Sequence, residues 1–307
     1  MNKKILIYRN CPLCDSKIAQ LKYKRNYDLN ELKGDENLFS ARRERKKKAY
    51  EHNTFLQCSD CDMIYANPII NPSIVEKLYN QSKFNYSDEQ KNIQRSYGSL
   101  LKIAEKYIKN KGNLLDIGAG NGFFMLEALN QGYNQVQGIE PSKHAVVLAD
   151  SRVKKNIIND ILRPNQLKKD YFDAISIFQT IDHIENPNEI LSICNKALKK
   201  DGLMLVISHD VESFSARFMG EKSPIFDIEH TQLFSRKTIS KILEKNGFKV
   251  LEIVNISNTY ALEYWIKLSP VPKLIKTFLK KIFDFTGLSS MQITIKPGNF
   301  GIIARKI

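Results

Sequence analysis

From Asn113 to the end of the chain, short apolar runs alternate with segments of helical periodicity. Seven of these runs have the length of buried strands, and they span residues 114–117, 136–140, 156–159, 172–178, 203–208, 248–254 and 300–304. Such alternation is typical of a parallel sheet that helices cover on both faces. The sequence therefore predicts an α/β fold built on a seven-stranded, doubly wound sheet.

A helix over residues 188–199 fits this alternation. Its apolar residues share one face at helical spacing, and they are Ile190, Leu191, Cys194, Ala197 and Leu198. Gly202 follows the basic end of the segment, where glycine commonly terminates a helix. We therefore expect Cys194 to be a core residue.

Two insertions interrupt the alternation, at residues 209–231 and 258–299. The second contains a basic amphipathic segment whose apolar face consists of Leu274, Ile275, Phe278, Leu279, Ile282 and Phe283. A face of this kind usually packs against its own protein, and that is the expectation here. The alternative is peripheral contact with an anionic membrane surface.

The loop after the first strand carries glycine at every second position, as Gly118, Gly120 and Gly122. Glycines at a strand-to-helix turn let a ligand approach the backbone closely. A dinucleotide fingerprint needs its third glycine three residues after the second, where this chain has Phe123. The loop therefore argues against a nicotinamide cofactor with its pyrophosphate.

The second strand ends in Glu140, where a carboxylate can accept hydrogen bonds from both hydroxyls of a ribose. A glycine loop alone is weak evidence for a cofactor. Together with an acidic strand end and βαβ spacing, it is strong evidence.

These motifs resemble those of the class I S-adenosylmethionine (SAM) dependent methyltransferases, and they follow the same order from Asn113 onwards. The resemblance implies a Rossmann-like methyltransferase sheet with SAM as methyl donor. It also implies a set of cofactor-binding residues: Asp116, Gly118, Gly120 and Gly122 at the methionine end, Glu140 at the ribose, Asp160 and Ile161 at the adenine, and Gln179 facing the methionine portion.

Two CxxC pairs lie in the N-terminal part, Cys11 with Cys14 and Cys58 with Cys61. Tetrahedral Zn²⁺ is commonly held by four thiolates presented in such pairs. A redox pair is the competing interpretation. His52 could replace one ligand, but we expect it to be an ordinary surface histidine.

The cysteine pairs also divide the chain. We expect a small zinc-ribbon-like module at residues 1–71 and a helical linker or lid at 72–112. The methyltransferase domain, with its two insertions, then occupies residues 113–307.

Two further segments, residues 61–68 (CDMIYANP) and 229–235 (EHTQLFS), resemble a subset of these methyltransferases. That subset has an N-terminal zinc module and is common in sugar and surface-polysaccharide biosynthesis. The resemblance implies a sugar acceptor, either a nucleotide-sugar or a glycan. The zinc-containing sugar C-methyltransferases have a large extra C-terminal domain that this chain lacks, which favours methylation of oxygen over carbon.

Methylation of a sugar hydroxyl requires removal of its proton. His183 follows the fourth strand at the carboxyl edge of the sheet, where doubly wound folds bind ligands, and is the first candidate for the general base. His230 is the second candidate. A bracing role for His183, through hydrogen bonds within its loop, is the alternative.

The net charge of the chain does not identify its binding partner. The formal net charge of +14 suits phosphate-bearing partners such as nucleic acid, nucleotide-sugars or an anionic membrane face, but it also fits the Lys-rich composition of a low-GC genome. No apolar stretch reaches the roughly 18 residues of a membrane span, and the N-terminus does not resemble a signal peptide. A cytoplasmic location, with peripheral contact at the inner face of the membrane as an option, is expected.

Two other functions stay open. The cysteine pairs and the basic run at residues 42–48 could serve an RNA (rRNA or tRNA) methyltransferase, although the run lacks interleaved aromatic residues. A non-enzymatic binding protein with a degenerate methyltransferase fold is the third reading, and the intact glycines and Glu140 argue against it.

Overall fold

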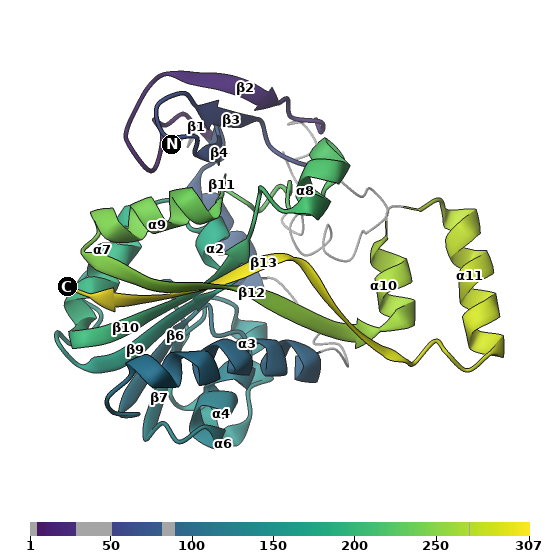
Figure 1. Ribbon diagram of the computed structural model, residues 1–307. Helices are drawn as coiled ribbons and strands as arrows, with labels where there is room; N and C mark the ends of the chain where they lie inside the picture. Colours follow the sequence, from purple (N-terminus) through teal and green to yellow (C-terminus); the bar gives the residue numbers. More distant parts are fainter. Residues whose placement is uncertain (1–4, 29–50, 82–89, 270) are drawn as a thin grey trace.

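The computed structural model describes residues 5–28, 51–81, 90–269 and 271–307, so the basic run at 42–48 lies outside the described residues. Its largest sheet has seven strands in the order β12-β13-β10-β9-β6-β7-β8 (Figure 1). Five of them run parallel: β6 (Asn113–Ile117), β7 (Gln135–Ile139), β8 (Ile157–Ile158), β9 (Phe172–Phe178) and β10 (Leu198–His209). β13 (Gln292–Lys306) lies antiparallel between β10 and β12 (Phe248–Ala261). All seven predicted strands are present.

The two faces of this sheet bury separate cores because successive side chains of a strand point to opposite faces. On β6, Leu115 joins one apolar cluster and Leu114 joins the other. The first cluster contains α7 (Pro187–Ala197) and α9 (Arg236–Lys245). The second contains α3 (Gln90–Ala104), α4 (Phe123–Asn130) and α6 (Ser151–Lys154). The sheet is therefore doubly wound, as predicted.

The helix predicted at 188–199 is α7, which ends two residues earlier than expected. Cys194 is fully buried, so its assignment to the core is confirmed. Leu198 leaves the helix because it adopts an extended conformation and pairs with Phe172 of β9.

The N-terminal part forms small sheets. β1 (Leu6–Ile7) pairs with β5 (Ile69–Ile70), and a four-stranded sheet has the order β11-β4-β3-β2. Three of its strands are β2 (Ala19–Tyr23), β3 (Phe55–Cys58) and β4 (Ile64–Ala66). The fourth, β11 (Gln232–Leu233), comes from the main domain just after the first insertion. The N-terminal sheet is thus completed by a strand from more than 160 residues away.

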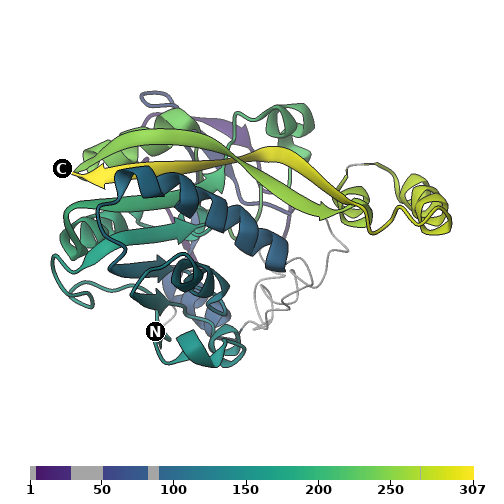
Figure 2. The same cartoon turned by 60° about the horizontal axis from the view of Figure 1, so that its bottom comes forward.

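The second insertion prolongs β12 and β13 into a two-stranded ribbon, which pairs as far as Ala261 with Gln292. The ribbon carries α10 (Leu262–Leu268) and α11 (Lys273–Phe285) away from the body as a projecting arm (Figures 1 and 2). Leu274 is 85% exposed and Phe278 64% exposed. The expectation that this apolar face packs against its own protein is therefore wrong for most of the face, because the ribbon holds the helix beyond the core. Leu279 and Phe283 of the face are half-buried, and α11 contacts α10.

The remaining connections are short. They include α2 (Pro72–Gln81) and η2 (Glu105–Tyr107) before the main sheet, α5 (Lys143–Val147) after β7, η3 (Ile181–His183) after β9, and α8 (Phe214–Met219) with η4 (Gly220–Lys222) in the first insertion. Among the described helices, none has the length and apolar content to cross a membrane.

Arg9 joins the N-terminal part to the loops at the carboxyl edge of the main sheet. Its guanidinium donates hydrogen bonds to backbone carbonyls of Ala66 (3.2 Å), Glu185 (2.7 Å) and Thr231. Burial lowers the pKa of Arg9 to about 10, which leaves the group charged at neutral pH. One cation therefore satisfies carbonyls from three separate segments.

Replacing Arg9 with Met should lower the free energy of unfolding by about 2 to 4 kcal/mol, because hydrogen bonds from a charged donor contribute about 1.5 to 3 kcal/mol each and the carbonyls would lose their partner. Urea unfolding measures this change. The control is Arg152→Ala, which removes an exposed ion pair with Asp150 and should change stability by less than about 0.5 kcal/mol. Equal stability of the two variants would contradict the role of Arg9.

Candidate functional site

The glycine loop lies where the strand order reverses, between β9 and β7 on either side of β6. Doubly wound folds bind ligands outside the carboxyl ends of the strands at such a point. Gly118, Gly120 and Gly122 all have positive φ, at 78°, 56° and 77°. A Cβ on Gly118 would lie 2.3 Å from Oγ1 of Thr180. The loop therefore needs glycine both for its conformation and for close packing against the segment after β9.

Glu140 connects this loop to the end of β7. Its Oε2 accepts a hydrogen bond from the N–H of Gly120 and its Oε1 accepts one from the N–H of Ser142, both at 2.8 Å. Each carboxylate oxygen has further lone pairs, so ribose hydroxyls can still donate to it. The backbone thus fixes the orientation of Glu140 before any ligand binds.

Asp116 lies at the base of the loop and accepts a hydrogen bond from the Ser176 hydroxyl at 2.7 Å. Burial raises the pKa of Asp116 to about 7, and the hydrogen bond from Ser176 opposes this rise. Negative charge on Glu140 adds to the rise. A cationic group bound at the loop would favour the ionised carboxylate.

Gln179 and Asp160 follow the ends of two other strands of the sheet, β9 and β8. Gln179 follows β9 with φ of 48°, and its Oε1 is buried with no hydrogen-bond partner among the described residues. Asp160 follows β8, accepts the N–H of Ile161 at 2.8 Å and forms an ion pair with Arg163, whose hydrogen bond lowers the pKa of the Asp160 carboxyl. Gln179 therefore offers an unused buried acceptor, whereas the carboxylate of Asp160 is shared with Arg163.

Three histidines gather at the same edge of the sheet. His183 belongs to η3, and its ring centroid lies 4.7 Å from that of His230. His209 ends β10, with its ring centroid 5.4 Å from that of His230. Nδ1 of His183 lies 3.2 Å from the hydroxyl of Tyr79 on α2 and 3.9 Å from Oε2 of Glu229. The two predicted histidines are thus brought together.

Sequence reasoning missed His209, Asp182 and Tyr79 as members of this cluster. His209 ends a strand at the carboxyl edge, which is the same signal that singled out His183. Tyr79 carried no comparable signal, because only the packing of α2 brings it to His183.

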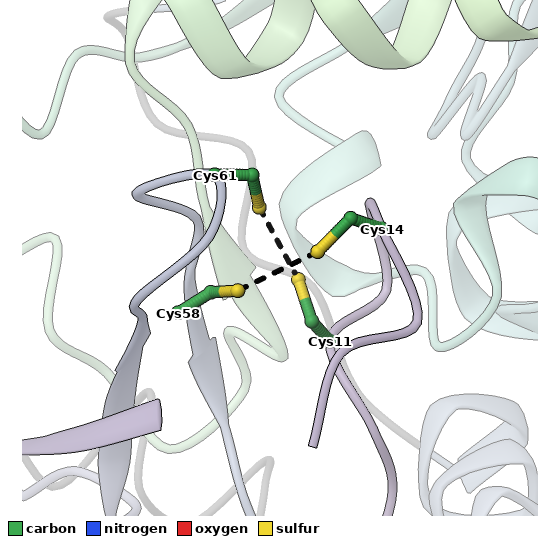
Figure 3. Close-up of side chains that lie close together, drawn as sticks. All are labelled: Cys11, Cys14, Cys58 and Cys61. Atoms are coloured by element: carbon green, nitrogen blue, oxygen red, sulfur yellow. Dashed lines mark hydrogen bonds between the residues drawn. The ribbon is translucent and has the colours of Figure 1, made fainter. Parts of the chain in front are cut away.

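The four cysteines of the N-terminal part point to a common centre (Figure 3). The Sγ atoms of Cys11 and Cys61 lie 3.5 Å apart, as do those of Cys14 and Cys58, and all four lie within 4.8 Å of one another. A tetrahedral site with Zn–S bonds of about 2.3 Å separates its sulfurs by roughly 3.8 Å, whereas a disulfide requires about 2.05 Å. The four sulfurs are therefore spaced for a shared ion and not for disulfides.

Both cysteine turns have the same backbone geometry. The residue after each pair, Asp15 or Asp62, has positive φ (62° and 66°), and its N–H donates to the carbonyl of the first cysteine of its pair at 2.9 and 3.1 Å. His52 is not part of this cluster. It is fully buried, with Nε2 3.0 Å from Oε1 of Glu221, so the expectation of a surface histidine is wrong.

A family described as "Methyltransferase domain" matches residues 90–253, just over half of the chain. The chain belongs to this family. The prediction of a SAM-dependent methyltransferase is thereby confirmed at the level of the family. The match covers the glycine loop, Glu140 and His183 but begins after the cysteine pairs.

Curated relatives include a ubiquinone biosynthesis O-methyltransferase of Glaesserella parasuis, 28% identical over 33% of this chain and 49% of that protein. Another is EEF1A lysine methyltransferase 2 of Mus musculus, 28% identical over 38% of this chain and 53% of that protein. This chain thus spans about half the length of these relatives. Among solved structures, a SAM-dependent methyltransferase of Archaeoglobus fulgidus is 19% identical with a TM-score of 0.46, over 71% of this chain and 97% of that one.

Proposed function

We propose that this protein transfers a methyl group from SAM to a hydroxyl of a sugar, presented as a nucleotide-sugar or within a glycan. The observation that carries the proposal is the course of the loop after β9. Thr180 packs against Gly118 of the proposed donor site, and three residues later the same loop presents His183 beside Tyr79 and Glu229. One short segment therefore links a SAM site to a group that can accept a proton.

The residues at the glycine loop fit SAM. Glycines with positive φ leave room beside the backbone, Asp116 and the buried oxygen of Gln179 can accept hydrogen bonds from the methionine ammonium, and Glu140 can accept them from the ribose hydroxyls. We place the adenine beside Asp160 and Ile161 at the end of β8. When bound, SAM supplies an electrophilic methyl on a sulfonium.

Glu140→Gln should weaken SAM binding by about 10- to 100-fold, since a charge-assisted hydrogen bond contributes about 1.5 to 3 kcal/mol and an amide cannot accept on both sides. Calorimetry with SAM and S-adenosylhomocysteine measures the loss, and NAD should not bind. The control is Glu244→Gln on the exposed face of α9, which should bind SAM like the wild type. Unchanged affinity in Glu140→Gln would mean that the ribose lies elsewhere.

Chemistry at the acceptor requires one proton to leave as the methyl group arrives. We assign its removal to His183: the hydroxyl oxygen attacks the methyl carbon, the bond from sulfur to carbon breaks, and S-adenosylhomocysteine remains. Oε2 of Glu229, 3.9 Å from Nδ1, would stabilise the protonated ring. Alignment of donor and acceptor can supply roughly 7 to 11 kcal/mol of the barrier. The Glaesserella relative is named as an O-methyltransferase, which supports oxygen as the methylated atom.

If His183 is the base, His183→Ala should lower turnover by about 10²- to 10⁴-fold and leave SAM affinity nearly unchanged. Labelled SAM is offered in parallel to nucleotide-sugars, cell glycans and total RNA, with His144→Ala as the matched control. A bracing role would instead give a small loss of turnover and a less stable protein. Label in RNA alone would replace the sugar assignment by the RNA alternative, and label on carbon would indicate C-methylation.

We further propose that Cys11, Cys14, Cys58 and Cys61 hold one structural Zn²⁺. Their sulfurs come from two matching turns and converge on one point, which supports a shared ion over a redox pair. The turns are also fixed from outside: Lys245 Nζ donates to the carbonyl of Leu13 at 2.7 Å. The site would therefore stabilise the contact between the N-terminal part and α9.

Protein prepared without chelator should contain about one zinc per chain in this site, and Cys58→Ser should lose both the metal and solubility, because a structural ion contributes to folding. Metal analysis by mass spectrometry measures the zinc. Cys194→Ala, which changes the cysteine of α7, should retain it. Metal-free wild-type protein would refute the zinc site.

The arm supports one further proposal, peripheral contact with an anionic membrane at its cytoplasmic face. Phe278 and Leu274 of α11 are largely exposed, and the segment 258–299 has six lysines against two acidic residues. Apolar side chains beside lysines match a surface of acyl chains under anionic headgroups. A glycan acceptor attached to a lipid would then lie close to the enzyme.

Phe278→Glu should weaken binding to anionic phospholipid vesicles by about tenfold or more, because burial of a phenylalanine contributes roughly 1.5 to 3 kcal/mol. Co-sedimentation measures the binding. The control is Phe214→Glu, a change of equal charge at a residue on α8 that is 84% exposed. If wild-type protein stays in the supernatant, the arm has another role.

A further inference from the structure

A second group of metal-ligating side chains lies at the carboxyl edge of the main sheet. Asp182, His209 and His230 each offer one ligand atom, and these three atoms lie within 4.8 Å of one another. They come from three different segments: η3 after β9, the end of β10, and the loop before β11. This group is separate from the four cysteines.

Hydrogen bonds fix the orientation of both histidine rings. Nδ1 of His209 lies 2.9 Å from Oδ1 of Asn299, and Nδ1 of His230 lies 2.7 Å from the backbone carbonyl of Ile225. Each acceptor requires the proton on Nδ1, which leaves a lone pair on Nε2. Metal-binding histidines are usually held in this way: the ring nitrogen that does not bind the ion donates its N–H to a hydrogen-bond acceptor.

Asp182 provides the third group. The residue is 1% exposed, and its Oδ1 accepts a hydrogen bond from the Ser208 hydroxyl at 2.7 Å. Its Oδ2 is buried and has no hydrogen-bond partner among the described residues. A buried carboxylate oxygen without a partner is costly, and a bound cation would satisfy it.

The backbone around these residues is also fixed. Both the N–H and the hydroxyl of Thr231 donate to the carbonyl of Asp182, at 2.8 and 3.1 Å. His230, the neighbour of Thr231, is therefore held against the loop that carries Asp182. The three groups keep their spacing without help from a ligand.

We propose that Asp182, His209 and His230 form a binding site for a divalent transition-metal ion. Two imidazoles and one carboxylate favour Zn²⁺, Fe²⁺, Mn²⁺ or Co²⁺ over Mg²⁺ and Ca²⁺, which prefer oxygen ligands alone. Three protein ligands leave coordination positions open for an acceptor. Acceptors with adjacent oxygen atoms, such as neighbouring hydroxyls of a sugar, are the chemical class that such a site would hold.

This role in acceptor binding rests on the function proposed above, whereas the metal site itself does not. The site assigns His230 to the metal and leaves His183 as the proton acceptor. An ion here would polarise an acceptor oxygen and so assist loss of its proton.

The test adds Co²⁺ to purified protein whose cysteine site already holds zinc. Wild-type protein should bind one additional Co²⁺ per chain, which calorimetry measures. Its visible absorption spectrum should show bound Co²⁺ but no charge-transfer bands from thiolate to cobalt. Asp182→Asn and His209→Gln should each weaken this binding at least tenfold, and His144→Gln should not. SAM affinity is measured on every variant to show that the domain is folded. If Asp182→Asn does not fold, the result for His209→Gln decides whether the metal site exists.

Absence of Co²⁺ binding, charge-transfer bands that place the ion on cysteine, or equal binding by Asp182→Asn and wild type would each overturn the site. The two proposals fail separately. Co²⁺ binding without methyl transfer to sugars would refute the sugar methyltransferase and keep the metal site. Methyl transfer to sugars by protein that binds no additional Co²⁺ would refute the metal site and keep the sugar methyltransferase.

Discussion

The reversal of strand order at β6 is the constraint on which the functional part of this molecule depends. Neighbouring parallel strands on either side of β6 send their connections to opposite faces of the sheet, so the space above the carboxyl end of β6 stays open. Three glycines with positive φ turn the chain away from that space. The segment after β9 can then pack so closely against Gly118 that no side chain fits between them.

The same edge collects polar groups from several distant segments. Ser208 and His209 end β10, Asp182 and His183 follow β9, and Glu229 with His230 precede β11. Water is excluded from part of this group, since Asp182 and His230 are nearly fully buried. Buried polar groups usually have hydrogen-bond partners. Here Ser208 bonds to one oxygen of Asp182, and Asn299 and Ile225 accept from Nδ1 of His209 and His230, whereas Oδ2 of Asp182 has no partner among the described residues. The edge is therefore a preorganised polar site within an otherwise apolar core.

Much of the fold could be predicted because its signals are local. Apolar runs indicated the strands, the spacing of Gly118, Gly120 and Gly122 indicated a tight strand-to-helix turn, and the paired cysteines indicated that four thiol groups converge. The rest depends on contacts between distant segments. The amphipathic pattern of α11 is the same whether its apolar face is buried or exposed. The length of the β12–β13 ribbon determines how far this face lies from the core. His209 and Tyr79 reach the histidine cluster through tertiary packing, which periodicity cannot reveal, and His52 is buried for the same reason.

The N-terminal part is tied to the candidate site by more than chain connectivity. β11 pairs with β4 on one side, and the side chain of Gln232 in β11 donates to the carbonyl of Ile181 at 2.8 Å on the other. Arg9 adds bonds to Glu185 and Thr231 on the same two loops. A disturbance of the cysteine turns would therefore be transmitted through β4 and β11 to the loop that holds His183. An ion bound by the four cysteines, although it would lie outside the candidate site, would thus stabilise the geometry of that site.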